Sequence, residues 1–187
     1  MSLIDELLAD AREHMDKSVD ATRAKFGSVR TGRASPALLD RIHVDYYGAQ
    51  TPLKQLATVS APEARLLTVQ PYDKSSIKAI ERAIMESDLG LTPNNDGSII
   101  RLQVPELTEE RRKQLVKVVR SLTEEGKIAL RNIRRDVMHD LKELKDAGEA
   151  GADDEHRAEE ALQKLTDEKV KELDALVKAK EEEILEV

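Results

Sequence analysis

Apolar residues recur every three or four positions along three long segments, and this spacing is that of one face of an α-helix. The segments cover residues 2 to about 30, 108 to 145 and 153 to 185. Ser2 and Thr108 stand where the first two helices would need an N-cap. Helices of this length with a single apolar face need partners along their whole length, so we expect them to form an elongated three-helix bundle.

The second segment has the longest uninterrupted pattern. Gly148 and Gly151 follow it and would end the helix, after which Asp153 or Asp154 would cap the third helix. The apolar positions of the second segment define its expected core face: Leu115, Val118, Leu122, Gly126, Ala129, Ile133, Val137, Leu141 and Leu144.

The middle of the chain has a different pattern. All six prolines lie between residues 36 and 105, and apolar and polar residues alternate there with the period of a strand. We expect strands at 41–46, 67–70 and 99–104, a weaker strand at 56–60, and one short helix from residue 75 or 76 to 86. These elements predict a small α/β domain inserted between the first two bundle helices.

The predicted fold is therefore α+β, with a bundle domain of residues 1–30 and 106–187 and an inserted domain of residues 31–105. Two short segments join the domains. Gly32 provides backbone freedom in the first, and Pro105 fixes φ in the second. We expect a hinge formed by Thr31, Gly32, Arg33, Ala34, Ser35, Val104, Pro105 and Glu106.

Charge is distributed unevenly along the second helical segment. Between residues 111 and 135 nine residues are Lys or Arg and two are Glu, a local charge of +7 in a chain with a net charge of −7. On a wheel of about 100° per residue, seven of these cations fall on the side opposite the core face. We call them the basic stripe: Lys113, Lys117, Arg120, Lys127, Arg131, Arg134 and Arg135.

The basic stripe can be a solvated helix face or a phosphate-binding surface. The segment from residue 153 to 187 has thirteen acidic and six basic residues of mixed order, which is the pattern of a merely solvated face. By comparison the basic stripe favours binding of phosphate. The rest of the acidic protein would repel phosphate, so binding would be confined to the stripe.

Composition excludes several kinds of function. The chain has one Phe, three Tyr, no Trp and no Cys, which disfavours base stacking on aromatic rings and excludes disulfides and thiolate chemistry. No run of apolar residues approaches eighteen, so we expect neither a membrane partner nor export. The four histidines, His14, His43, His139 and His156, have no metal-ligand spacing. We expect no metal, no cofactor and no catalytic residues.

Five stretches of the chain resemble the bacterial ribosome recycling factor family along its whole length. They are RTGRASP at 30–36, DYYG at 45–48, SDLGL at 87–91, LTEERRK at 107–113 and RNIRRD at 131–136. The resemblance implies a cytoplasmic, non-enzymatic translation factor, L-shaped overall, with a three-helix bundle and an inserted β/α/β domain.

The same resemblance implies partners and contact residues. The partners would be the large ribosomal subunit and elongation factor G, which hydrolyses GTP while the subunits separate, and we expect a monomer with no DNA partner. The family's rRNA-contacting arginines fall on Arg112, Arg131 and Arg134. The last two belong to the basic stripe, whereas Arg112 lies at its boundary with the core face. The predicted rRNA-binding set is therefore Arg112 together with the basic stripe.

Two other interpretations remain open. The chain could be an adaptor whose bundle binds another helical protein, or an enzyme with a site around Asp45 and Tyr46, although no cluster of titratable groups supports the latter. The sequence from Tyr46 to Gly48 predicts a strand end and a turn, and alternatively a Tyr exposed to a partner.

Overall fold

The computed structural model describes residues 1–29 and 31–186. Arg30, the first residue of the RTGRASP stretch and the predicted end of the first domain segment, and Val187 lie outside the described residues. Contacts between Cα atoms divide the chain into a helical unit, Met1–Phe26 with Val116–Glu182, and a second unit, Gly27–Leu115 with Glu183–Val187. The second is called the inserted unit.

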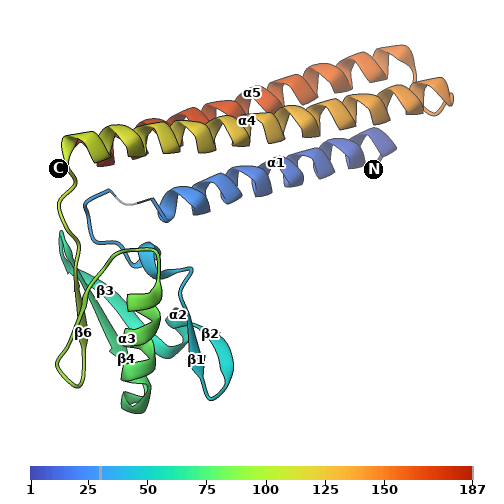
Figure 1. Cartoon of the computed structure of the whole chain (residues 1–187). Helices are drawn as coiled ribbons and strands as arrows, with labels where there is room; N and C mark the ends of the chain where they lie inside the picture. The colour runs from blue at the N-terminus through green and yellow to red at the C-terminus, as the bar shows by residue number, and fades with distance from the viewer. Residues whose placement is uncertain (30, 187) are drawn as a thin grey trace. The chain divides into compact units, whose positions relative to one another are not determined.

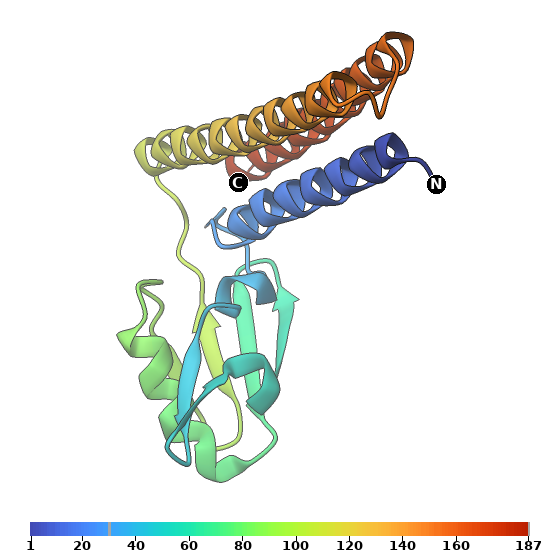
Figure 2. The ribbon, with the colours of Figure 1, turned by 90° about the vertical axis from the view of Figure 1, so that its right-hand side faces the viewer.

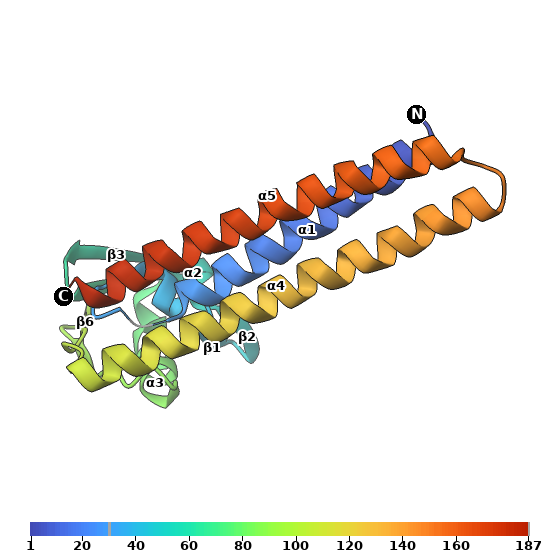
Figure 3. The ribbon, with the colours of Figure 1, turned by 90° about the horizontal axis from the view of Figure 1, so that it is seen from above.

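Three long helices run side by side in the helical unit (Figures 1 and 3). They are α1 (Leu3–Gly27), α4 (Glu109–Asp146) and α5 (Ala152–Leu185), and they confirm the three predicted helical segments. The first seven residues of α4 and the last three of α5 belong to the inserted unit. Within the described residues no helix is both long and apolar enough to span a membrane.

Side chains cap both predicted helix starts. Ser2 Oγ accepts a hydrogen bond of 3.1 Å from the Asp5 amide, and Asp5 Oδ2 accepts one of 3.1 Å from the Ser2 nitrogen. This reciprocal arrangement resembles a capping box. Thr108 Oγ1 likewise accepts from the Arg111 amide at 3.1 Å.

The turn between α4 and α5 is a Schellman motif. Gly148 has φ 74°, its amide donates to Lys145 O at 3.0 Å, and the Glu149 amide donates to Leu144 O at 2.9 Å. The next helix begins earlier than predicted, at Ala152. The prediction that Asp153 or Asp154 is its cap was therefore wrong. Both carboxylates lie in the first turn, where they favour the positive end of the helix dipole.

The buried face of α4 is rotated from the predicted one by less than one residue. Leu115, Gly126, Val137 and Leu141 are buried as predicted. Val119 and Leu130 are fully buried, whereas Val118, predicted to be core, is 45% exposed. The reason is that α4 packs against both α1 and α5, and the positions of these two helices decide which side of α4 is buried. Gly126 lies in this arc, and a Cβ there would stand 2.7 Å from Thr22 Oγ1 and 3.2 Å from Leu173 Cδ1. The three helices therefore approach closely where α4 has no side chain.

In the part of the inserted unit that the structure describes, six antiparallel strands form two sheets beside the helix α3, Ile77–Glu86 (Figure 2). The strands β1 and β2 form a hairpin, and the second sheet has the order β3-β4-β6-β5. The strands are β1 (His43–Tyr46), β2 (Ala49–Pro52), β3 (Ala57–Glu63), β4 (Leu66–Pro71), β5 (Pro93–Asn95) and β6 (Ile100–Gln103). Short helical turns are η1 (Pro36–Leu39), α2 (Leu53–Leu56) and η2 (Lys74–Ser76).

The inserted unit has its own core, formed where α3 covers the sheet. Ile80 and Ile84 of α3 are fully buried with Leu67 of β4 and Leu102 of β6. Leu67 and Leu102 alternate with less buried residues, as predicted for strands, and Ile80 and Ile84 have the helical spacing of four. The structure confirms these strands and this helix. The edge strands β2 and β5 were not predicted.

Candidate nucleic-acid interface

All seven residues of the basic stripe project from α4, and the structure separates them into two rows. Five of them are exposed, while Lys127 and Arg134 are half-buried. The difference follows from position: the rotated buried face brings residues 127 and 134 to the edge that α4 shares with α5. One row therefore faces α5 and the other faces away from it.

The α5-facing row consists of Arg120, Lys127 and Arg134, spaced seven residues apart. Arg120 Nε lies 2.6 Å from Glu181 Oε1, and Lys127 Nζ lies 2.7 Å from Asp174 Oδ1. The hydrogen bond and charge of Glu181 raise the pKa of Arg120.

The third member of this row is bonded through an amide. Arg134 Nη1 donates to Gln163 Oε1 at 3.0 Å, and Gln163 Nε2 donates to Asp167 Oδ1 at 2.9 Å. The α5-facing row thus joins two helices at seven-residue intervals, as charged flanking pairs do in coiled coils.

The remaining four cations, Lys113, Lys117, Arg131 and Arg135, form the outer row. The side chains of Lys113, Arg131 and Arg135 are 72%, 57% and 72% exposed. Each has an acidic neighbour on α4 itself: Lys113 Nζ is 3.3 Å from Glu109 Oε1, Arg131 Nη1 is 3.3 Å from Glu124 Oε1, and Arg135 Nε is 4.0 Å from Asp136 Oδ1. Exposed pairs of this kind contribute about 0 to 1 kcal/mol, so a phosphate can replace the acidic partner at little cost.

Arg112 stands apart from both rows. It is half-buried, and its Nε is the buried side-chain polar atom without a hydrogen-bond partner among the described residues. A guanidinium N–H in this position is costly unless some other group accepts from it. Arg112 thus differs from the outer row in its burial, although the family resemblance predicts all of them as rRNA contacts.

The two hinge segments are both held by the turn between β3 and β4. The Ala34 amide donates to Ala64 O at 2.6 Å, and the Val104 amide donates to Arg65 O at 2.8 Å. Arg65 Nη1 also lies 2.9 Å from Glu106 Oε1. Sequence reasoning missed this turn, because the hydrogen bonds use backbone groups of Ala64 and Arg65 and no residue type indicates them.

Gly32 keeps a left-handed backbone. Its φ is 78°, a conformation that glycine adopts without steric cost. Beside it, Arg33 Nη2 donates to Glu186 Oε2 at 3.3 Å. Of the predicted hinge residues, Ala34 and Val104 are thus hydrogen-bonded to the β3–β4 turn, and Gly32 has a backbone conformation that favours glycine.

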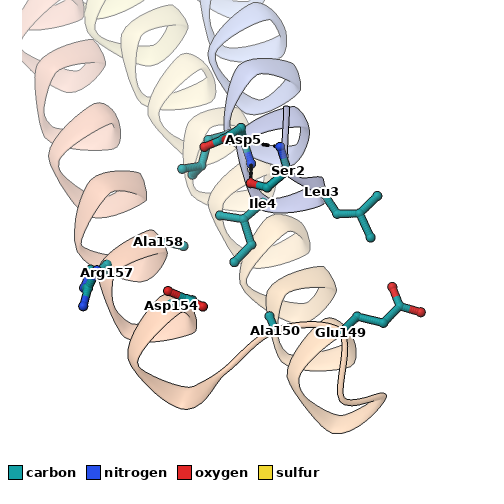
Figure 4. A pocket seen from close by; sticks show the side chains of 10 residues that line it. Ser2, Leu3, Ile4, Asp5, Glu149, Ala150, Asp154, Arg157 and Ala158 are labelled. Carbon is teal, nitrogen blue, oxygen red and sulfur yellow. Dashed lines mark hydrogen bonds between the residues drawn. The ribbon is translucent and has the colours of Figure 1, made fainter.

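The end of the bundle that carries the α4–α5 turn has a hollow of about 420 Å³ (Figure 4). Ile4, Leu8 and Ala158 supply apolar lining, and Asp5 and Asp154 are among its acidic residues. None of the basic stripe lines it. In the part of the chain that the structure describes, no three His, Asp or Glu side chains are grouped to hold a metal.

A family model described as ribosome recycling factor matches residues 22–185. The chain belongs to the ribosome recycling factor family. Ribosome-recycling factors are 54% identical over 180 residues in Rubrobacter xylanophilus and 56% identical over 182 residues in Halalkalibacterium halodurans. These matches cover 96% and 97% of this chain and 97% and 98% of the relatives.

Solved structures of ribosome recycling factors have the same fold. A solution structure superposes with a TM-score of 0.81 at 40% identity and covers 100% of both chains. The T. thermophilus ribosome recycling factor, bound with the E. coli elongation factor G to the E. coli post-termination complex, gives a TM-score of 0.70 at 49% identity, over 99% of this chain and 100% of that one. The predicted family and α+β class are confirmed.

Proposed function

We propose that this protein releases ribosomes for reuse: it binds the large subunit after termination and, with elongation factor G and GTP, separates the subunits. The observation that carries the proposal is the family match, which spans nearly the whole chain at more than half identity. The likeness to a recycling factor bound with elongation factor G to a post-termination complex supports both partners.

Within this function, the outer row is proposed to hold rRNA. An RNA helix is recognised largely through its shape and backbone, and a straight row of cations on one long helix fits a phosphate backbone. Arg131 and Arg135 have the most suitable geometry, because each guanidinium is exposed and pairs with a carboxylate of α4 itself, at 3.3 and 4.0 Å. The α5-facing row supports the surface by fixing α5 beside α4, and its guanidinium groups keep N–H donors for a phosphate.

Arg112 is proposed to reach rRNA by a different route. The unpartnered Nε would gain an acceptor if a phosphate or a rearrangement of the first turn of α4 brought one to it. The local structure around Arg112 would then change on binding, whereas the outer row would bind without a change in structure.

The domain boundaries and the hinge are likewise part of the proposal. Ala34 and Val104 are hydrogen-bonded to the β3–β4 turn. We therefore expect the backbone rotation of the predicted hinge to occur in residues other than these two. The rotating segments would be residues 31–33 and 105–108, on the bundle side of those two hydrogen bonds. The mechanism is then mechanical: elongation factor G moves the inserted domain while the bundle stays on rRNA.

No catalysis is assigned to the protein itself. We propose a cytoplasmic, monomeric factor without cofactor, in which the GTPase supplies the free energy. The rival adaptor function predicts binding to helical proteins and no salt-sensitive affinity for ribosomes.

The test is a splitting assay on purified post-termination ribosomes, followed by light scattering. Subunit separation is expected only when this protein, elongation factor G and GTP are all present. A protein that sediments with ribosomes and yet leaves the splitting rate unchanged at every concentration of elongation factor G would contradict the proposed function.

A further inference from the structure

The turn of the β1–β2 hairpin contains a residue that is poorly suited to its backbone. Tyr47 has φ 50° and Gly48 has φ 79°, while Tyr46 pairs with Ala49 across the turn. A two-residue turn with two positive φ angles favours Asn-Gly, whereas a bulky side chain at the first position has a steric cost. Among the described residues, Tyr47 is the one non-glycine residue with positive φ. The turn itself gives no reason for a Tyr here.

The ring of Tyr47 is exposed and yet held in place. Its exposed fraction is 83%, and it meets the Tyr46 ring edge to face, with centroids 4.6 Å apart and an interplanar angle of 74°. Tyr46 packs against the core of the inserted unit, and its hydroxyl donates to Asp73 Oδ2 at 3.1 Å. The Ser75 amide and hydroxyl donate to Asp73 Oδ1 at 2.9 and 2.7 Å. This chain of contacts orders an exposed aromatic ring before any partner arrives, which lowers the entropic cost of binding.

Charge around the hairpin favours a cationic protein side chain over RNA. Between His43 and Pro52 the chain has one carboxylate, the exposed Asp45, and no Lys or Arg. Residues 31–105 as a whole carry eight basic and eight acidic residues. A phosphate backbone would find no cation at the hairpin, whereas an Arg or Lys would find both a π-face and a carboxylate.

We propose that Tyr47 is a docking residue for elongation factor G, which lays an arginine or lysine side chain on the exposed ring and pairs it with Asp45. The inference rests on the proposed function, because it takes elongation factor G as the second partner. The cations of the basic stripe lie on α4, in a different element, and the hairpin itself has the Asp45 carboxylate and no Lys or Arg, which favours a cationic protein side chain. Asparagine at position 47 would relieve the steric cost, but it has no aromatic ring on which a cation could lie.

The experiment compares Tyr47→Asn, Tyr47→Phe and Tyr47→Lys with the parent protein, using Met85→Gln as the control. Met85 is 63% exposed on α3 of the same unit, so the control removes exposed apolar surface elsewhere. Three quantities are measured: the concentration of elongation factor G that gives half-maximal splitting, the affinity for ribosomes without it, and Tm.

Tyr47→Asn is expected to raise the half-maximal concentration of elongation factor G by roughly fivefold to thirtyfold, the range of a cation–π contact that becomes desolvated. Its Tm should equal or exceed that of the parent, because asparagine suits the turn. Tyr47→Phe and Met85→Gln should stay within about twofold of the parent. Tyr47→Lys should lose at least as much as Tyr47→Asn, because like charges would meet.

Three results would overturn the proposal. The first is a half-maximal concentration for Tyr47→Asn within twofold of the parent, or no different from Met85→Gln. The second is a ribosome affinity that falls in Tyr47→Asn without elongation factor G, which would assign the ring to the ribosome. The third is tighter and more salt-dependent ribosome binding by Tyr47→Lys, which would assign the hairpin to RNA. Failure of the parent itself to split ribosomes would instead contradict the proposed function.

Discussion

Arg131 and Arg134 are three residues apart and have different surroundings. Arg131 is exposed and pairs with Glu124 on its own helix, whereas Arg134 is half-buried and bonded to Gln163 of α5. Removing Arg134 therefore affects helix packing as well as any rRNA contact. Removing Arg131 tests the binding surface alone.

We predict that Arg131→Ala weakens binding to the large subunit by roughly 1.5 to 3 kcal/mol, the range for a lost hydrogen bond to a charged group. The free energy of unfolding should change by about 0.5 kcal/mol or less, as for most surface substitutions. Co-sedimentation with large subunits and urea unfolding measure the two effects.

The matched control is Lys164→Ala, which removes an exposed cation from α5 and should affect neither quantity. Equal ribosome affinity of Arg131→Ala and the parent would remove Arg131 from the proposed surface.

Among the elements, α1 and α5 are joined by a buried lysine. Lys169 is 7% exposed, and its Nζ lies 2.6 Å from Asp16 Oδ1 and 2.8 Å from Glu172 Oε1. The hydrogen bonds from these carboxylates raise the pKa of Lys169. The lysine is therefore charged in the folded protein at neutral pH, because its bonds to the two carboxylates outweigh the desolvation of its ammonium group.

We predict that Lys169→Met lowers the free energy of unfolding by about 1 to 2 kcal/mol at pH 7. The loss is smaller than for breaking a fully buried ion pair, because the two carboxylates are half exposed. Because the folded pKa is raised, the lysine's contribution is complete below the unfolded pKa of about 10.4. It is lost as the pH rises through the folded value.

Urea unfolding of parent and variant from pH 7 to 11.5 should thus show a difference in the free energy of unfolding that is constant near neutral pH. The difference should shrink at the alkaline end. Lys164→Met on the same helix should show no difference at any pH. A difference for Lys169→Met that persists unchanged above the folded pKa would mean that packing, rather than charge, accounts for the effect.

The long helices and the strands that alternate cleanly were predictable because burial imposes a period on the sequence. Two kinds of element were not. The edge strands β2 and β5 are short and contain Pro, Gln and Asn, which have weak strand preference. The exact buried arc of α4 depends on where its two neighbours lie, so Val118 and Val119 could not be assigned from one helix alone.

The candidate site was predictable as a set of residues and not as two rows. The acidic residues of α5 at 167, 174 and 181 repeat every seven positions, as do the cations at 120, 127 and 134. Matching these two repeats would have indicated the α5-facing row from the sequence. The unpartnered Nε of Arg112 has no such signal, because it depends on side-chain packing.

In the molecule as a whole, binding is assigned to α4 and motion to the two hinge segments. Replacing Gly32 and Pro105 together by alanine is predicted to leave ribosome affinity within about twofold, because binding is assigned to α4. The splitting rate should fall by about fivefold or more, since alanine at φ 78° is strained and the second segment loses its fixed φ.

Affinity from co-sedimentation and the splitting rate from light scattering measure the two effects on the same preparation. Equal losses of affinity and splitting would show that the hinge segments orient the bundle for binding rather than permit motion.

The measurement that tests the central claim most directly is the salt dependence of binding to the large subunit. If the four outer-row cations, Lys113, Lys117, Arg131 and Arg135, neutralise phosphates, log affinity should fall against log salt with a slope of roughly −3 to −4. Arg131→Ala should flatten that slope by somewhat less than one. A slope near zero, with binding to the subunit intact, would contradict the assignment of the basic stripe to rRNA.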